Sequence, residues 1–225
     1  MTSTVEAPTA TSAFESYLSA VRAGDRRRAF AAVDEARESG MTVARIYLEV
    51  LQPTLREIGR LWQQNEISVA DEHLATAITQ AAMARLYEQV FVWQPGTGHT
   101  LIAACADVER HEIGLRMLCD LLELEGWETT YLGAMVPVES LVAMVLKRRP
   151  TAVALSIAMA PHLPRLRTMI QAIRETTGDA QPLIVVGGRP FLDDPELATR
   201  LGADFTAPDA SAAVEMLRVR AEGRG

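Results

Sequence analysis

The distribution of apolar residues changes character along the chain. From about residue 13 to residue 93, apolar side chains recur every three or four positions, which places them on one face of a helix. Gly24-Asp25 and residues 39–42 interrupt this pattern and are typical of a helix end followed by a new N-cap. Pro53 is expected to begin or kink a further helix, and a long helix is expected from about Val69 to Val92. The pattern predicts a bundle of four or five helices.

A different pattern follows a linker, Gln94–His99, that is rich in glycine and proline. Short apolar runs now alternate with longer amphipathic stretches. The runs predict strands over residues 101–106, 128–132, 152–156, 183–186 and 204–206, and the stretches predict helices over 113–125, 138–148, 164–176, 195–201 and 211–222. This alternation predicts a doubly wound parallel sheet, and five strands in this length fit a flavodoxin-like domain.

Composition narrows the class of protein. The 225 residues are 48% hydrophobic and 23% charged, which suits one or two folded domains. The net charge of −7 disfavours nonspecific nucleic-acid binding, which depends on neutralising phosphates. We interpret the one dense basic run, Arg26–Arg28, as a solvated helix turn. The predicted organisation is a disordered tail over 1–12, a helical-bundle domain over 13–93 and a Rossmann-like domain over 100–225.

Cysteine usage and hydropathy bear on location. Cys105 falls in a predicted strand and Cys119 in a predicted helix, so we expect buried free thiols rather than a disulfide framework. Residues 1–12 lack the apolar core of a signal peptide, and no apolar stretch approaches the roughly 20 residues that span a bilayer. We expect a cytoplasmic protein with no membrane partner.

His111 is the first candidate functional residue. It follows the first predicted strand and precedes a helix, and ligands of open α/β sheets bind at that edge. Glu109 is placed to accept the proton of the ring nitrogen not used for ligation, which suits a metal ligand. Gly114 leaves space for a bulky planar ligand near the backbone. A structural histidine and a catalytic acid/base are the alternative interpretations.

Residues with small side chains lie at the ends of the third and fourth predicted strands. Ser156 closes the third strand, and Gly187 and Gly188 follow the fourth. Alone, a glycine pair after a strand indicates only a tight turn. With His111 these residues form a row along one sheet edge that can line a slot for a ligand tail. The chain has no phosphate-binding P-loop motif, and a serine at the end of the third strand argues against a phospho-receiver domain.

A second constellation lies in the helical half. Trp62 ends one predicted helix, Ser68 is a candidate N-cap for the next, and Glu72 and His73 fall in its first turns. The alternative is a core tryptophan beside surface charges.

These motifs resemble two known families of cobalamin-binding module. Glu109-x-His111-x-x-Gly114, Ser156 and the glycine pair resemble the cobalamin-binding domains, whose pattern is Asp-x-His-x-x-Gly, a serine after the third strand and Gly-Gly after the fourth. The helical half resembles the module that caps the upper face of the corrin in methionine synthase and its relatives. The resemblance covers residues 13–220.

A narrower resemblance concerns the helical half. Trp62, followed after nine residues by Glu72-His73, is similar to the CarH/LitR-type adenosylcobalamin photoreceptors. That resemblance implies that Trp62 covers the upper face against the 5′-deoxyadenosyl group, and that Glu72 and His73 hydrogen-bond around it. Glutamate in place of aspartate at position 109 also occurs in the photoreceptor branch.

The cobalamin-binding resemblance assigns the remaining roles. His111 is expected to be the lower axial ligand of cobalt, replacing the dimethylbenzimidazole base of the cofactor. The displaced tail is expected to pass Ser156 and the pair Gly187-Gly188. The neighbours of His111 are expected to belong to the same cofactor-binding segment: Glu109, Arg110, Glu112, Ile113 and Gly114.

Two departures shape the expected function. Gln63 stands where photoreceptors that form a bis-histidine product have a histidine, so water or hydroxide is expected as the upper ligand after light, giving hydroxocobalamin. Only about 12 residues precede the first helix, in place of the MerR-like winged-helix domain of those repressors. We therefore expect a stand-alone sensor, not an enzyme, with no direct DNA binding.

Such a sensor is expected to act through a separate regulatory protein or transcription factor, and a homo-oligomer is allowed. A corrinoid methyl carrier for a methyltransferase system is the alternative, and a passive cobalamin carrier is a third hypothesis.

Overall fold

The computed structural model describes residues 9–90, 95–178 and 181–223, which form two compact units, Met1–Phe91 and Val92–Gly225. Most of the tail predicted over 1–12 lies outside the described residues, and the first helix already begins at Ala10. The end of the long helix predicted to Val92 and the start of the linker at Gln94 also lie outside them.

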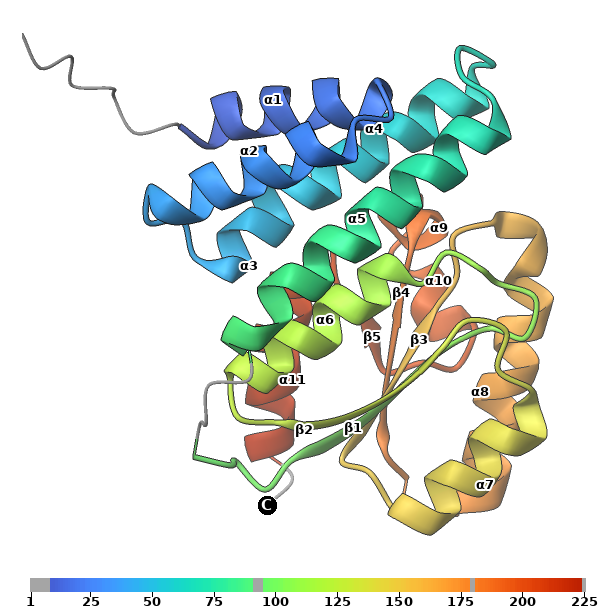
Figure 1. Cartoon of the computed structure of the whole chain (residues 1–225). Helices are drawn as coiled ribbons and strands as arrows, with labels where there is room; N and C mark the ends of the chain where they lie inside the picture. The colour runs from blue at the N-terminus through green and yellow to red at the C-terminus, as the bar shows by residue number, and fades with distance from the viewer. Residues whose placement is uncertain (1–8, 91–94, 179–180, 224–225) are drawn as a thin grey trace, which may run out of the picture. The chain divides into compact units, whose positions relative to one another are not determined.

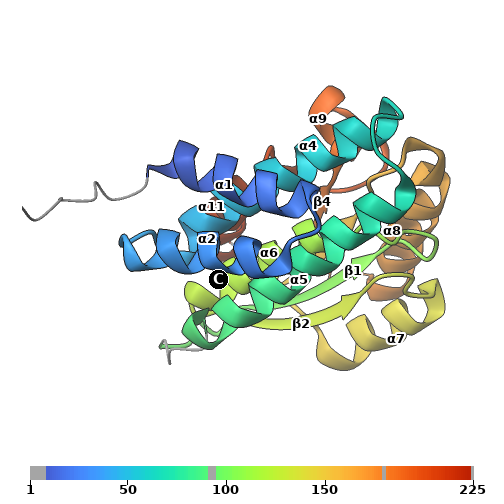
Figure 2. The same ribbon diagram turned by 45° about the horizontal axis from the view of Figure 1, so that its top comes forward.

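The described part of the first unit is all helical, as predicted (Figure 1). Helices α1, α2 and α5 pack side by side, and α4 packs against both α1 and α5 (Figure 2). The elements are α1 Ala10–Arg22, α2 Arg26–Glu38, α3 Val43–Arg45, the π-helix η1 Ile46–Leu51, α4 Gln52–Gln63 and α5 Val69–Val90.

A π-helical turn precedes Pro53. The backbone N–H of Gln52 donates to the carbonyl of Tyr47, five residues earlier, and Pro53 lies in the first turn of α4 as predicted. Because proline has no N–H to donate, the wider turn lets α3, η1 and α4 follow one another without an interruption. The sequence did not predict this π-helix.

The turn between α4 and α5 is fixed at both ends. Asn65 adopts the left-handed conformation with φ 57°, and the N–H of Glu66 donates to the carbonyl of Leu61, which closes α4. Ser68 Oγ accepts the Asp71 N–H at 3.2 Å, while the Asp71 carboxylate accepts the Ser68 N–H at 2.9 Å. This reciprocal capping box confirms Ser68 as the cap of α5.

A buried polar contact crosses the helical core. The Tyr17 hydroxyl donates to Thr79 Oγ1 at 3.1 Å, and Thr79 donates in turn to the carbonyl of Ala75 at 2.9 Å. Burial raises the pKa of Tyr17 to about 12, so the phenol stays protonated and keeps its donor. The contact ties α1 to α5 at one register.

The second unit is a five-stranded parallel sheet in the order β2-β1-β3-β4-β5, which is the flavodoxin-like order and confirms the predicted fold. Residues 101–105 of β1 are all buried, as expected for a strand covered on both faces. The strands are β1 Thr100–Cys105, β2 Glu128–Gly133, β3 Ala152–Ser156, β4 Leu183–Gly187 and β5 Phe205–Thr206.

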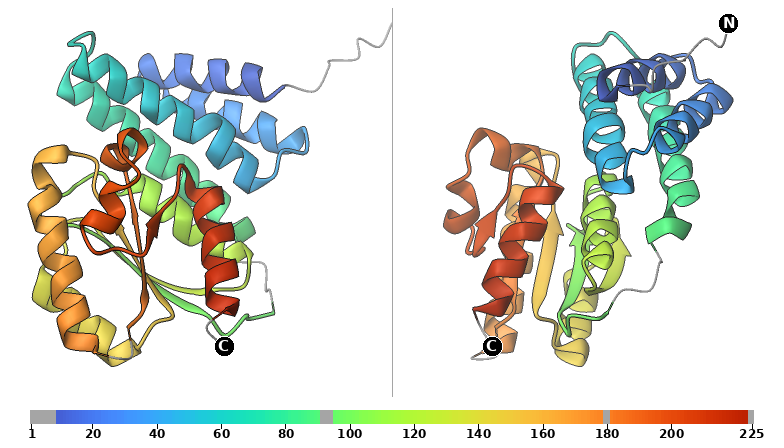
Figure 3. Two further views of the ribbon diagram at one scale, coloured as in Figure 1. Left: turned by 180° about the vertical axis from the view of Figure 1, so that it is seen from behind. Right: turned by 90° about the vertical axis from the view of Figure 1, so that its left-hand side faces the viewer.

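Helices cover both faces of this sheet. Helix α6 packs against α11 on one face, and α7 packs against α8 on the other; seen from behind, α8 and α11 lie on opposite sides of the strands (Figure 3). The helical elements are α6 Ile113–Leu124, α7 Val138–Arg148, the 3₁₀ turn η2 Ala160–His162, α8 Leu163–Thr177, α9 Arg189–Asp193, α10 Leu197–Arg200 and α11 Ala210–Glu222. The sequence did not predict η2 or α9.

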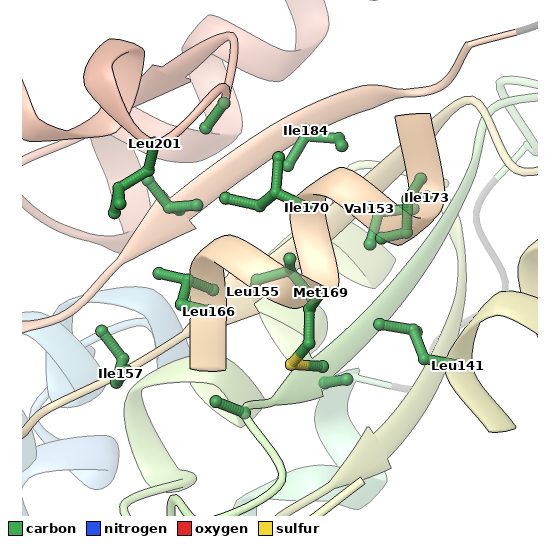
Figure 4. Close-up of a cluster of buried hydrophobic side chains, with 14 of the residues drawn as sticks. Leu141, Val153, Leu155, Ile157, Leu166, Met169, Ile170, Ile173, Ile184 and Leu201 are labelled. Carbon is green, nitrogen blue, oxygen red and sulfur yellow. The ribbon is translucent and has the colours of Figure 1, made fainter. Parts of the chain in front are cut away.

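A hydrophobic core of this unit lies between the sheet and the α7–α8 layer. Leu166, Met169 and Ile170 of α8 point toward Val153 and Leu155 of β3 in a closely packed cluster (Figure 4). These apolar side chains are almost fully buried, and burying each contributes roughly 1.5–3 kcal/mol of transfer free energy. This packing holds the strands in the register that positions their ends.

Strands β1, β3 and β4 end at the same level, at the point where the strand order reverses. Cys105 pairs with Ser156, and Ser156 pairs with Gly187, so β1, β3 and β4 end side by side. The strand order reverses between β1 and β3, the place where open α/β sheets bind ligands. Among the described residues, no helix is long and apolar enough to cross a membrane.

Candidate functional site

The loop from β1 to α6 places an exposed histidine beside a buried carboxylate. The Glu109 side chain is 0% exposed, whereas the His111 ring is 45% exposed. The N–H of Glu109 donates to the carbonyl of Ala106 at 2.8 Å, which folds the loop back against the strand end. The loop therefore presents the imidazole at the surface and keeps its carboxylate partner inside.

The first carboxylate oxygen of Glu109 holds the histidine. Oε1 accepts the backbone N–H groups of Arg110 at 2.9 Å and His111 at 3.0 Å, and it also bonds His111 Nδ1. An imidazole that donates from Nδ1 carries its lone pair on Nε2. This is the tautomer that a metal ligand requires.

The second carboxylate oxygen reaches the loop after β3. Oε2 accepts the N–H groups of Ala158 at 2.8 Å and Met159 at 3.2 Å, and it lies 3.2 Å from Nδ1 of His162. A single side chain of Glu109 thus joins the loops after β1 and β3.

The loop after β2 is tied to the same segment. The N–H of Met135 donates to the Glu109 carbonyl at 3.1 Å, and the N–H of Ala134 donates to Glu112 Oε2 at 2.9 Å. Met135 has φ 55°, a left-handed conformation that is uncommon for a bulky residue, and its side chain is exposed. Strain of this kind persists where surrounding bonds fix the backbone.

Glu109 is ionised in this environment. Burial alone would raise its pKa, but the bonds from the His111 ring and from backbone N–H groups hold the pKa well below its usual value. Burial together with the charges of Glu109 and Glu112 raises the pKa of Cys105 to about 12. Cys105 Sγ contacts the His111 carbonyl at 3.7 Å, so this thiol is a protonated structural group. Cys105 and Cys119 are both buried free thiols, as predicted.

Gly187 is the last residue of β4 and Gly188 follows it, and the fold constrains the two positions differently. Gly188 has φ 119°, and a Cβ there would lie 1.8 Å from the carbonyl oxygen of Ile157, so the fold itself requires glycine. A Cβ on Gly187 would meet nothing within 4 Å. The space beside Gly187, next to Ser156, is therefore open for a ligand.

The other predicted residues of this segment occupy distinct places. Arg110 is exposed, Ile113 is buried at the start of α6, and Glu112 is half-buried. Gly114 is exposed, and a Cβ there would also meet nothing within 4 Å. The structure therefore places Glu109, His111, Ser156 and Gly187 at one edge of the sheet, with Gly114 on the adjoining helix.

The helical unit holds a second pair of a carboxylate and an imidazole. Glu72 Oε2 lies 2.6 Å from His73 Nδ1, and Glu72 Oε1 accepts the Thr76 hydroxyl at 3.0 Å. The ring of His73 is exposed, and Trp62 is half-buried near the end of α4. The carboxylate of Glu72 is thus held by α5 and orients an exposed imidazole.

His162 was missed by the sequence reasoning. It follows the third strand by six residues, as a histidine in a loop at the same sheet edge, and that position was the available signal. Its shared use of Glu109, 53 residues away in the chain, is visible only in three dimensions.

The residues at this sheet edge can supply one ligand to a metal whose other ligands come from a cofactor. Within the described ranges, no group of three or more His, Cys, Asp and Glu side chains is arranged to hold a metal ion. One imidazole with a fixed tautomer, beside glycines that leave open space, suits a metal already carried in a planar macrocycle.

Comparison with known proteins identifies that macrocycle. Two family models, each described as a B12 binding domain, match residues 13–87 and 99–217. The second match alone covers more than half of the chain. The chain therefore belongs to the B12-binding domain family and is a cobalamin-binding protein, which confirms the resemblance seen in its motifs.

Individual relatives fall into two groups. The chain is 31% identical over 173 residues to the HTH-type transcriptional repressor CarH of Myxococcus xanthus, covering 77% of this chain and 56% of the repressor. It is 24% identical over 192 residues to dimethylamine corrinoid protein 2 of Methanosarcina acetivorans, covering 83% and 86%. The chain thus spans little more than half the length of the first relative.

A solved structure shares the fold. The monomethylamine corrinoid protein of Methanosarcina barkeri superposes with a TM-score of 0.82 at 20% sequence identity, covering 94% of this chain and all of that one. This likeness supports the architecture of a helical region followed by a Rossmann-like domain.

Replacing the buried carboxylate tests its structural role. Glu109→Gln puts an amide NH₂ against backbone N–H donors and removes a charge that they stabilise, so the free energy of unfolding should fall by about 3 kcal/mol. Glu112→Gln is the matched control, because its amide oxygen can still accept the Ala134 N–H, and it should cost about 1 kcal/mol or less. Denaturant unfolding of the cofactor-free chain measures both; equal costs would contradict the assignment.

The stability difference between the parent and Glu109→Gln also depends on pH in a defined way. A carboxyl with a lowered folded pKa stabilises the fold fully above its unfolded pKa of about 4.5 and loses that contribution as the pH falls toward the folded pKa. The stability difference between the parent and Glu109→Gln should be constant above about pH 5 and shrink below it. A difference that grows on acidification would contradict the lowered pKa.

Proposed function

We propose that the chain is an adenosylcobalamin-dependent light sensor that signals through protein contacts, with His111 as the lower axial ligand of cobalt. The observation that carries the proposal is the exposed His111 ring, whose Nδ1 is held by a buried carboxylate. In this role the residues at the sheet edge bind and orient the cofactor, and the chain itself performs no covalent step.

The lower side of the cofactor is assigned to the sheet edge. His111 replaces the dimethylbenzimidazole base, and Glu109 fixes the ring with Nε2 as the ligating atom. The displaced nucleotide tail passes Ser156 and Gly187, and the open space beside Gly187 supports this path. Arg110, Ile113 and Gly114 border the same segment.

The upper side is assigned to residues of the helical unit. Trp62 shields the adenosyl group, and the pair Glu72–His73 offers a carboxylate oxygen and an imidazole for hydrogen bonds to its ribose or adenine. Because Gln63 offers no imidazole, water or hydroxide would take the upper position of a bound cobalamin after light. Adenosylcobalamin supplies a cobalt–carbon bond that light cleaves.

Signalling follows from the change at one site. Trp62 and the Glu72–His73 pair would lose a partner if the adenosyl group left, and the interactions that favour one arrangement of the helical unit would be lost with it. A regulatory protein or a further copy of the chain that binds only one arrangement can read this change.

A methyl-carrier function is the second candidate. The chain matches dimethylamine corrinoid protein 2 over 86% of that protein's length, which favours this candidate. A methyl carrier needs His111 and a helical cap, but it does not need the Glu72–His73 pair to hold an adenosyl group. The two functions are separated by which cobalamin the chain prefers and by its response to light.

Removal of the ligand tests the lower assignment. His111→Ala loaded with methylcobalamin should lose the absorption spectrum of histidine-ligated cobalamin, because no imidazole replaces the displaced base. His99→Ala is the control, since His99 precedes β1 at the opposite end of the sheet and should leave the spectrum unchanged. A parent-like spectrum in His111→Ala would show that another group ligates cobalt.

Illumination tests the sensor role. The chain loaded in the dark with adenosylcobalamin should change both its absorption spectrum and its assembly state, measured by size-exclusion chromatography with light scattering, after green light. The chain loaded with hydroxocobalamin is the control, because it has no adenosyl group and should not respond. Photolysis with unchanged assembly and unchanged hydrogen exchange of the helical unit would rule out the sensor.

The glycine pair offers a test of the tail path. Gly187→Ala should leave the unfolding free energy within about 1 kcal/mol of the parent, since its Cβ meets nothing in the fold, but should weaken cobalamin binding by roughly 1–3 kcal/mol through crowding. Gly188→Ala should instead lower stability by about 2 kcal/mol or more, because of its φ and the Ile157 carbonyl. Unimpaired binding by Gly187→Ala would contradict the assigned path.

A further inference from the structure

Four exposed arginines gather where α1 meets α2, two helices that pack side by side (Figure 2). Arg22 lies in the last turn of α1, and Arg26, Arg27 and Arg28 form the first turn of α2. Within the described residues, none of these four side chains forms a hydrogen bond or an ion pair, so their charges are free to meet a partner. We call these four residues the arginine corner.

Local helix stability does not explain this placement. The N-terminus of a helix carries a partial positive charge, so cations in its first turn are unfavourable. Helix α2 has no acidic residue in its first turn, and the nearest carboxylate belongs to its N-cap, Asp25, which accepts the Arg28 N–H at 3.0 Å. Helix α5 follows the usual rule, with Asp71 and Glu72 in its first turn. A local rule that is broken at an exposed site points to a function outside the stability of the fold.

A groove on α1 adjoins the arginine corner. It has a volume of about 440 Å³ and is lined by Glu15, Leu18, Ser19, Arg22 and Ala23. Leu18 and Ala23 give it an apolar wall, and Arg22 belongs to both the groove and the corner. An apolar surface beside unpaired cations matches a segment that carries an apolar side chain next to carboxylates.

The turn within the arginine corner touches the helix that carries the Glu72–His73 pair. Gly24 has φ 66°, and a Cβ at this position would lie 3.0 Å from Leu74 Cδ2, so the turn packs closely on α5. Leu74 directly follows His73 in the chain. A shift in the first turns of α5 therefore changes the support of the turn that joins α1 to α2.

We propose that the arginine corner and the adjoining groove bind an acidic segment of a partner protein. Its carboxylates pair with the guanidinium groups, each of which can hold a carboxylate through two parallel N–H donors, and an apolar side chain enters the groove beside Leu18. Nucleic acids and anionic membranes fit less well, because Glu15 lies in the groove and the chain has a net charge of −7. The light dependence of this binding rests on the proposed function, whereas the docking surface itself does not.

The probe is a fluorescent peptide of about 18 residues, long enough to form a helix, built from glutamate, alanine and leucine. A peptide with lysine in place of each glutamate is its control. Each peptide is titrated with the full-length chain, loaded with adenosylcobalamin in the dark, and binding is measured by fluorescence anisotropy. The acidic peptide should bind about tenfold more tightly than the basic one, because the basic one has the same sign of charge as the corner.

Charge reversal separates binding from folding. The double variant Arg27→Glu, Arg28→Glu should bind the acidic peptide about tenfold more weakly, because two attractive contacts become repulsive. It should unfold at a higher denaturant concentration than the parent, because acidic side chains suit the first turn of α2 and a glutamate three residues after Asp25 completes a capping box. The control, Lys147→Glu with Arg167→Glu, makes the same charge change on exposed residues of α7 and α8 and should bind within about twofold of the parent.

A partner that responds to light should also follow the state of the cofactor. The affinity of the parent for the acidic peptide should change about threefold or more after green light. Equal affinity in the dark and in light, with binding still lost in the charge-reversed variant, would support the docking surface and count against the light sensor. The two proposals therefore fail in different ways.

Three results would overturn the inference. Parent-like affinity in the charge-reversed variant would show that the arginines do not hold the peptide. Equal binding of the acidic and basic peptides would show no preference for an acidic segment. Tighter binding of duplex DNA or of phosphatidylserine vesicles than of the acidic peptide, lost in the same variant, would assign the arginine corner to a nucleic acid or a membrane instead.

Discussion

The ionised carboxylate of Glu109, fully buried at the end of the first strand, is the interaction on which the site depends. An isolated carboxylate removed from water costs several kcal/mol, so it can be buried only where donors surround it. Here four backbone N–H groups and two imidazoles supply those donors from two loops. The arrangement of these loops and the tautomer of His111 are consequences of one buried charge.

The sheet makes this convergence feasible. Because Cys105, Ser156 and Gly187 are paired in register, the loops that follow them begin at the same level and lie within reach of one side chain. The apolar layer beneath α7 and α8 holds that register. Positive φ angles at Gly188 and Met135 then bring the loop backbones close to one another, at a conformational cost that the packing and hydrogen bonds offset.

Much of this could be predicted from the sequence, and the remainder could not for physical reasons. Alternating apolar runs and amphipathic stretches define the parallel sheet, because burial on both faces demands continuous apolar strands. The spacing of Glu109 and His111 identifies their pairing, which is local. The contact between His162 and Glu109 joins residues 53 apart in the chain, and the difference between Gly187 and Gly188 depends on the position of the Ile157 carbonyl. Neither leaves a periodic signal.

The central claim is that a histidine of this chain, held by Glu109, is the lower ligand of cobalt. Its most direct test is the electron paramagnetic resonance spectrum of cob(II)alamin bound to chain whose histidines are labelled with nitrogen-15. An axial nitrogen from a labelled histidine splits each cobalt line into a doublet, whereas an unlabelled nitrogen of the cofactor's own base gives a triplet. Ligation by a histidine of this chain gives the doublet; a triplet that persists in the labelled protein would contradict it.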